Sequence, residues 1–121
     1  MSPPFTRLLL ATEHSAQDEG AETLAFVLAK RCGLPLQAVL PITSNPEFEA
    51  VAPQLAAHAE AQAGERIAAL MSDAKRTGLV LDLQARRGPE PWREIVEEAA
   101  ERGTDLLVIR RRGKRGLLAN L

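Results

Sequence analysis

Three stretches of the sequence share a pattern in which a helix ends at a glycine and a strand follows: AKRCGLPLQAVL, AKRTGLVLDLQA and AERGTDLLVIR. In each, a Lys or Arg precedes the glycine, where a positive charge favours the negative end of the helix dipole. Gly33, Gly78 and Gly103 suit the left-handed conformation just beyond a helix. Runs rich in Leu and Val come next, as strands require. The chain is therefore predicted to alternate helices and strands.

Apolar residues recur at helical spacing before each of these glycines. They form three stripes: Ala21, Leu24, Ala25, Leu28 and Cys32; Leu55, Ala59, Ala63, Ile67, Leu70 and Ala74; Trp92, Ile95, Val96 and Ala99. Pro53 and Pro91 fit the first turns of the second and third helices, so residues 44–52 are expected to be mostly loop. We interpret Trp92 as an anchor between the third helix and the sheet, with ligand stacking as the less favoured alternative. Replacing such an anchor by Ala costs about 3–5 kcal/mol.

The predicted strands are residues 7–10, 36–40, 79–85 and 106–109. Residues 8–10 and 106–109 are continuous apolar runs, typical of central parallel strands covered on both faces, and we expect these two strands to be neighbours. The alternating LVLDLQA favours a peripheral strand. The fold class is α/β: an open, mostly parallel sheet with helices on both faces. Residues 1–121 are predicted to form a single domain.

Bulk properties exclude several classes of protein. No apolar run approaches the roughly 20 residues that a membrane span needs, and the first residues lack the features of a signal peptide. The single Cys32 cannot form an internal disulfide, which fits a reducing compartment. We predict a cytoplasmic protein with no membrane partner. Aromatic residues make up 3% of the chain, too few for the stacking platforms of a single-strand nucleic-acid binder, and no nucleic-acid partner is predicted.

Open parallel sheets bind ligands beyond the carboxyl ends of their strands. After the first strand, Thr12, Glu13, His14 and Ser15 form a turn that leads into a helix. Capping of the helix by Ser15 or Glu13 is the favoured interpretation, and an anion or ribose site is the alternative. Adjacent turn residues point apart, so Glu13 and His14 are not expected to act as an acid–base pair. No catalytic or metal-binding residue is predicted, and His58 is expected to be a solvated or packed helix residue.

After the last strand comes RRRGKRG, which holds five of the 15 lysines and arginines of the chain. Glycines let backbone amides approach a phosphate, and cations neutralise it. However, Gly113-Lys114 is followed by Arg115 rather than by Ser or Thr, and no GxGxxG occurs. Taken alone, this basic loop is a weak signal.

Taken together, four stretches of the chain resemble the universal stress protein family: RLLLATEHS, LQAVLPIT, RRGPEPWREIVEEAAERGTDLLVI and RRRGKRGLL. The resemblance implies an open five-stranded parallel sheet with helices on both faces, often in a homodimer. A full member continues with a further helix and a fifth strand, and from the resemblance we expect these two elements to be missing from this chain. Some members bind ATP and others do not.

The resemblance also implies which residues meet a nucleotide. Glu13 stands where the family usually has an aspartate, and Pro41 stands where backbone contacts adenine. Gly113 matches the second glycine of the phosphate loop, whereas Arg110 replaces the first. The third glycine of that loop falls beyond Leu121. The implied cofactor-binding residues are Thr12, Glu13, Pro41, Ile109, Arg110 and Gly113.

An arginine at position 110 adds bulk and restricts positive φ, but it also adds a charge that binds phosphate by another geometry. The phosphate loop is therefore expected to have lost its standard geometry. The leading hypothesis is a non-catalytic stress-response or regulatory domain. The alternative is an ATP-binding member, with Mg²⁺ and with weak or no hydrolysis. An enzyme of related topology ranks below both, since it requires a complete phosphate loop and paired metal carboxylates.

Overall fold

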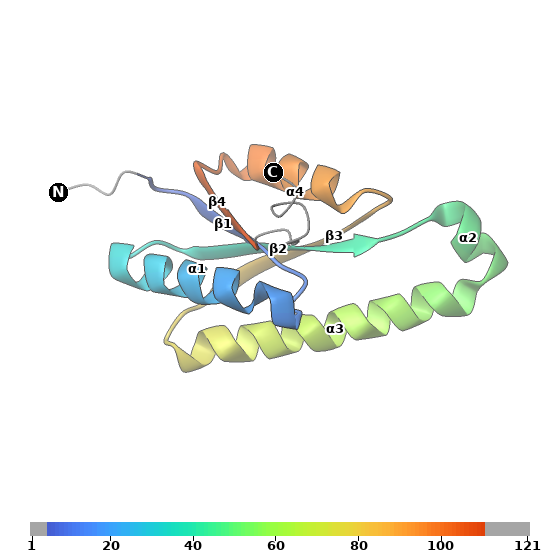
Figure 1. Ribbon diagram of the computed structural model, residues 1–121, viewed down its shortest axis with the longest axis horizontal. Coiled ribbons are helices and arrows are strands. Elements are labelled where there is room, and N and C mark those ends of the chain that lie inside the picture. The colour runs from blue at the N-terminus through green and yellow to red at the C-terminus, as the bar shows by residue number, and fades with distance from the viewer. Residues whose placement is uncertain (1–4, 111–121) are drawn as a thin grey trace, which may run out of the picture.

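The computed structural model describes residues 5–110, which alternate strands and helices as the sequence predicts (Figure 1). In chain order the elements are β1 Leu8–Ala11, the 3-10 helix η1 Ala16–Asp18, α1 Glu19–Cys32, β2 Leu36–Thr43, α2 Pro46–Val51, α3 Pro53–Arg76, β3 Leu81–Gly88, α4 Pro91–Arg102 and β4 Leu106–Ile109. Within these residues, no helix is both long and apolar enough to cross a bilayer.

All strands of the sheet run parallel, in the order β3-β2-β1-β4. The predicted α/β class with a parallel sheet is confirmed. The neighbouring placement of the first and last strands is also confirmed, since Leu8 of β1 pairs with Leu106 of β4. β3, which contains the alternating LVLDLQA, lies at one edge as expected.

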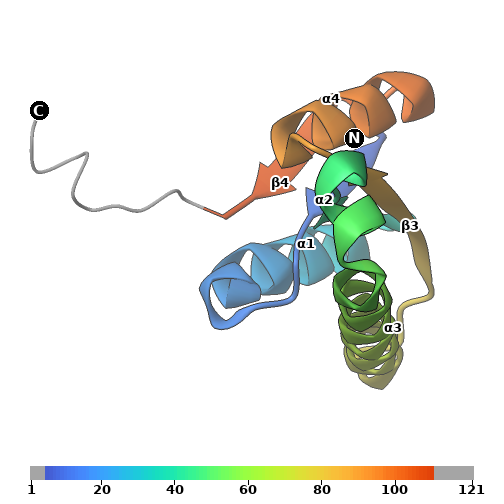
Figure 2. The same ribbon diagram turned by 90° about the vertical axis from the view of Figure 1, so that its right-hand side faces the viewer.

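The sheet separates two helical layers. Figures 1 and 2 show α1 and α3 on one face and α4 on the other. Leu8 and Leu10 of β1 join the core that packs against α1 and α3. Leu9 and Ala11, which point to the opposite face, join the core that packs against α4. The first strand is thus buried on both faces.

The three glycines adopt the conformation that the sequence predicts. Gly33 and Gly103 each follow a helix at φ 65°, and Gly78 lies just beyond α3 at φ 81°. A side chain is strained at such positive φ values. The glycines therefore let each helix end and the chain turn back toward the sheet.

The element boundaries differ from the predicted ones in two ways. β1, β2 and β3 each end later than expected, so the strands reach further toward the carboxyl edge of the sheet. Residues 46–51, expected to be loop, form the short helix α2. The side chain of Asn45 accepts hydrogen bonds from the backbone N–H groups of Glu47 and Phe48, at 3.1 and 3.2 Å. An N-cap followed by Pro46 is a helix start that the apolar pattern alone does not reveal.

The expectation that β4 is a central strand covered on both faces is wrong for the part of the chain described. Within residues 5–110, β4 is the edge strand beside β1. α1 packs on the face that carries Leu106 and Val108. α4 instead packs over β2 and β3, which leaves Leu107 and Ile109 on the other face 40% and 50% exposed.

Trp92 is not the predicted anchor of α4. Its side chain is 58% exposed. The residues of α4 that face the sheet are Ile95 and Glu98, with Ala99 packed beside them. The face of α4 that packs on the sheet is therefore not the one that the apolar residues predict. The carboxylate of Glu98 occupies part of the buried face, and Trp92 is turned outward.

Glu98 is buried because two arginines hold its carboxylate. Nη1 of Arg86 donates a hydrogen bond to Oε1 of Glu98 at 3.0 Å, and Arg102 bonds the other oxygen. Burial alone raises the pKa of Glu98, but the hydrogen bonds from Arg102 and Arg86 outweigh burial and lower it. A charged group paired in this way can lie inside a helix–sheet interface.

Exposure of Trp92 predicts a small effect of Trp92→Ala on stability. We expect the free energy of unfolding to fall by about 1 kcal/mol or less, as at other surface positions. Ile95→Ala, one turn later on the buried face, should cost about 2–5 kcal/mol. Urea denaturation of both variants tests this, and a larger loss for Trp92→Ala than for Ile95→Ala would contradict it.

Asp105 joins the chain segments that precede β1 and β4 through hydrogen bonds. Its carboxylate accepts hydrogen bonds from the backbone N–H groups of Thr6 at 2.9 Å and Arg7 at 2.8 Å. Its own N–H donates to the carbonyl of Arg7 at 2.9 Å. The backbone N–H groups of Thr6 and Arg7 hold the pKa of the Asp105 carboxyl below its usual range.

A lowered carboxyl pKa stabilises the fold above the unfolded-state pKa, and the stabilisation is lost as pH falls through the folded-state pKa. We therefore expect Asp105→Asn to lower the free energy of unfolding at pH 7. The difference from the wild type should shrink below about pH 5. Denaturation across this pH range measures it, with Glu65→Gln in exposed α3 as the control. A pH-independent difference would refute the role of the carboxylate.

Candidate functional site

A pocket of about 300 Å³ lies beyond the carboxyl ends of β1, β2 and β4. The lining includes five of the residues that the sequence analysis selected: Thr12, Glu13, Pro41, Ile109 and Arg110. They lie near the ends of β1, β2 and β4, or just after them, and these strand ends meet at one edge of the sheet. Gly113, the sixth predicted residue, lies outside the described residues.

Five further residues line the pocket and were not predicted as site residues: Ala11, Asp18, Pro91, Trp92 and Ile95. Pro91, Trp92 and Ile95 come from the first turns of α4, which reaches the pocket because it packs across the sheet. Asp18 comes from η1. Its spacing from Ser15 is that of a capping box, and that signal could have identified it.

Asp18 organises the turn after β1. Its buried Oδ2 accepts hydrogen bonds from Oγ of Ser15 at 2.7 Å, from the N–H of Ser15 at 3.0 Å and from the N–H of Glu13 at 3.3 Å. Ser15 lies at the N-cap of η1, as the capping interpretation expects. The side chain of Glu13 instead lies at the pocket, so its carboxylate is available to a ligand.

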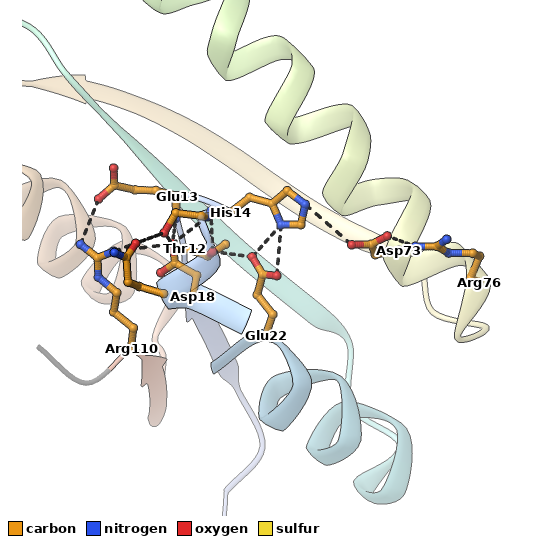
Figure 3. A network of polar contacts seen from close by, with 10 residues as sticks. Thr12, Glu13, His14, Asp18, Glu22, Asp73, Arg76 and Arg110 are labelled. Atoms are coloured by element: carbon orange, nitrogen blue, oxygen red, sulfur yellow. Dashed lines mark hydrogen bonds and ion pairs between the residues drawn. The ribbon is translucent and has the colours of Figure 1, made fainter. Parts of the chain in front are cut away.

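Arg110 stands beside the two carboxylates of the pocket (Figure 3). Its Nη2 is 3.8 Å from Oε2 of Glu13, and its Nη1 is 3.9 Å from Oδ2 of Asp18. Nη1 also donates to Oγ of Ser15 at 3.4 Å. These contacts are long, and both Arg110 and Glu13 are substantially exposed. An exposed ion pair such as Arg110–Glu13 is weak, about 0.2–1 kcal/mol, and the contact with the buried Asp18 is long, so the guanidinium is held loosely.

His14 is turned away from the pocket. Its backbone lies at φ 55°, and Figure 3 shows its ring pointing from Glu13 toward Glu22 and Asp73. Nδ1 lies 2.8 Å from Oε2 of Glu22, and Nε2 lies 3.7 Å from Oδ2 of Asp73. The expectation that Glu13 and His14 point apart is confirmed, and His14 links α1 to α3.

Thr12 connects this network to the pocket wall. Its buried Oγ1 donates to Oε2 of Glu22 at 2.6 Å and accepts from the backbone N–H of His14 at 2.8 Å. Thr12 therefore satisfies the buried carboxylate of Glu22 and fixes the turn at the same time.

Metal ligands are not grouped at this site. Among residues 5–110, no three His, Cys, Asp or Glu side chains are placed to hold a metal ion. His58 is exposed on α3.

A family model described as the Universal stress protein family matches residues 4–121. The chain belongs to this family. No curated protein sequence matched it, but solved universal stress protein structures share its fold.

Three of these structures illustrate the similarity. UspA from Lactobacillus plantarum has a TM-score of 0.77 at 19% identity, over 94% of this chain and 82% of that one. A universal stress protein family member from Burkholderia pseudomallei has a TM-score of 0.70 at 18% identity, over 98% and 89%. A universal stress protein in complex with cAMP has a TM-score of 0.52 at 18% identity, over 85% and 70%.

Because the hydroxyl of Thr12 makes two hydrogen bonds, we expect it to stabilise this universal stress protein domain. Thr12→Val keeps the shape but leaves the Glu22 carboxylate and the His14 N–H short of a partner. We expect the free energy of unfolding to fall by about 1–3 kcal/mol. Thr23→Val, the same change on the exposed face of α1, is the matched control. Equal denaturation midpoints for the two variants would disprove the role of Thr12.

Proposed function

We propose that this universal stress protein domain is a non-catalytic stress-response or regulatory domain that binds an adenine nucleotide in the pocket beyond β1, β2 and β4. One observation carries the proposal. Three separate strand ends bring Thr12, Glu13, Pro41, Ile109 and Arg110 to a single pocket. These are the positions that the family resemblance implies for a nucleotide.

The size and chemistry of the pocket fit the nucleoside part of such a ligand. Its volume of about 300 Å³ is at the low end for small-molecule sites. Apolar walls come from Pro41, Ile95 and Ile109, and a few polar residues complete the lining. Glu13 supplies carboxylate oxygens that accept hydrogen bonds from ribose hydroxyls. The phosphates would extend outward past Arg110.

Arg110 supplies the phosphate contact in place of the first loop glycine. Its ion pairs with Glu13 and Asp18 are long and partly exposed, whereas a bidentate arginine–phosphate contact is short and stronger. A phosphate can therefore draw the guanidinium from the carboxylates, and Glu13 becomes free to meet the sugar. Phosphate binding by the Arg110 side chain would thus differ from phosphate binding by the backbone N–H groups of a glycine-rich loop.

Two observations support a non-catalytic role and this class of ligand. The imidazole of His14, the histidine next to the pocket in sequence, is engaged by Glu22 and Asp73 away from it. A universal stress protein of the same fold is known in complex with cAMP, which is an adenine nucleotide. Both fit a domain that responds to a ligand without transforming it.

Calorimetric titration with AMP, cAMP and ATP, with and without Mg²⁺, tests the proposal. We expect binding of adenine nucleotides that weakens at high salt, because screening reduces the Arg110–phosphate attraction. Incubation with ATP should release no phosphate above the buffer rate. Lack of binding by all three nucleotides would reject the proposed ligand, and steady ATP turnover would reject the non-catalytic role.

The variant Arg110→Gly tests whether Arg110 binds the phosphate or obstructs nucleotide binding. Loss of a charged hydrogen bond worth about 1.5–3 kcal/mol should weaken AMP binding by about 10- to 100-fold. Arg31→Gln, at the exposed end of α1, removes a charge far from the pocket and should leave affinity unchanged. Tighter nucleotide binding by Arg110→Gly would instead show that the arginine blocks a glycine-loop geometry.

A further inference from the structure

We propose that Trp92 is the stacking platform for the purine base of the bound nucleotide. This inference rests on the proposed function and identifies the residue that recognises the base. Trp92 lies in the first turn of α4 and lines the pocket with Pro91 and Ile95. The indole is 58% exposed, although tryptophan is the largest apolar side chain available to the core.

The position of the indole at the pocket separates it from other exposed apolar residues. Val96, one turn further along α4, is 55% exposed but does not line the pocket. Scattered exposed apolar side chains need no explanation, whereas Trp92 is a large apolar residue that lines a pocket with other apolar residues. An aromatic ring in that lining offers a flat face to a flat ligand.

The indole is also restrained before a ligand arrives. The guanidinium carbon of Arg93 lies 5.5 Å from the centroid of the Trp92 ring, within the range of a cation–π contact. A restrained ring loses less conformational freedom when a base stacks on it. The Arg93 contact therefore favours binding without occupying the pocket, which Arg93 does not line.

The pocket then presents one surface for each part of a nucleotide. Trp92 offers an aromatic face for the base, Glu13 offers acceptors for the sugar, and Arg110 offers a cation for the phosphate. A ligand without a planar base uses only two of these surfaces. The geometry thus selects a nucleotide over a sugar phosphate.

The composition of the chain makes this inference testable by fluorescence. Trp92 is the one tryptophan in the sequence, and there is no tyrosine, so emission excited at 295 nm comes from this indole alone. Stacking of a purine on the ring should quench the emission in a saturable way as AMP is added. Ribose 5-phosphate, which carries the sugar and phosphate without a base, should not quench it.

Variants measured by calorimetry complete the test. Trp92→Leu removes the aromatic face and should weaken AMP binding by about 10- to 100-fold, as expected for loss of one base–aromatic stack. Trp92→Phe keeps a ring and should retain most of the affinity. Val96→Ala is the matched control on the same helix and should bind AMP as the wild type does. Denaturation midpoints confirm that each variant is folded.

The outcomes distinguish this inference from the proposed function. If the wild type binds AMP without quenching and Trp92→Leu binds equally well, the stacking role is overturned and the nucleotide site stands. If Trp92→Phe loses as much affinity as Trp92→Leu, the indole acts by packing and the stacking role is likewise overturned. If the wild type binds no adenine nucleotide, both are overturned.

Discussion

Burial of β1 on both faces is the constraint on which the rest of the structure depends. Leu8, Leu9 and Leu10 are almost completely buried, and the strand pairs with β2 on one side and β4 on the other. Alternation along the strand sends side chains into two separate cores, so helices must cover both faces. The chain leaves this buried strand at Thr12, and the turn that follows is therefore held at the pocket by the most deeply buried strand of the sheet.

Buried carboxylates decide how the helices rotate on that sheet. Glu22 of α1 and Glu98 of α4 are both nearly inaccessible. Glu22 is satisfied by Thr12 and His14, and Glu98 by two arginines. Each carboxylate takes a place on the buried face that an apolar residue would otherwise fill. Leu24 and Trp92 are correspondingly turned outward, at 50% and 58% exposure.

The sequence predicts those features that one local signal determines. Glycine stops, apolar periodicity and continuous apolar runs are local, and they gave the element order, the parallel sheet and the residues at the strand ends. Helix rotation depends instead on partners distant in sequence, such as Arg86 of β3 beside Glu98 of α4. A prediction from apolar periodicity assumes that carboxylates such as Glu98 are exposed. It therefore placed Trp92 on the buried face of α4, where Glu98 lies instead. The contribution of Asp18 to the pocket escaped prediction, and a ligand contact of Trp92 was only the less favoured interpretation, because tertiary packing brings η1 and α4 beside the strand ends.

The acidic wall of the pocket and the arginine at position 110 are physically linked. Glu13 and Asp18 both lie within 4 Å of the guanidinium, and without it an anionic ligand would approach two carboxylates. Like charges at such a distance repel, although solvent screens part of the repulsion at a partly exposed site. A loop of glycine amides donates hydrogen bonds but brings only partial charges to offset this repulsion, whereas Arg110 brings a full one. The departure from the glycine pattern is therefore consistent with a pocket that keeps its carboxylates for the sugar and still admits a phosphate.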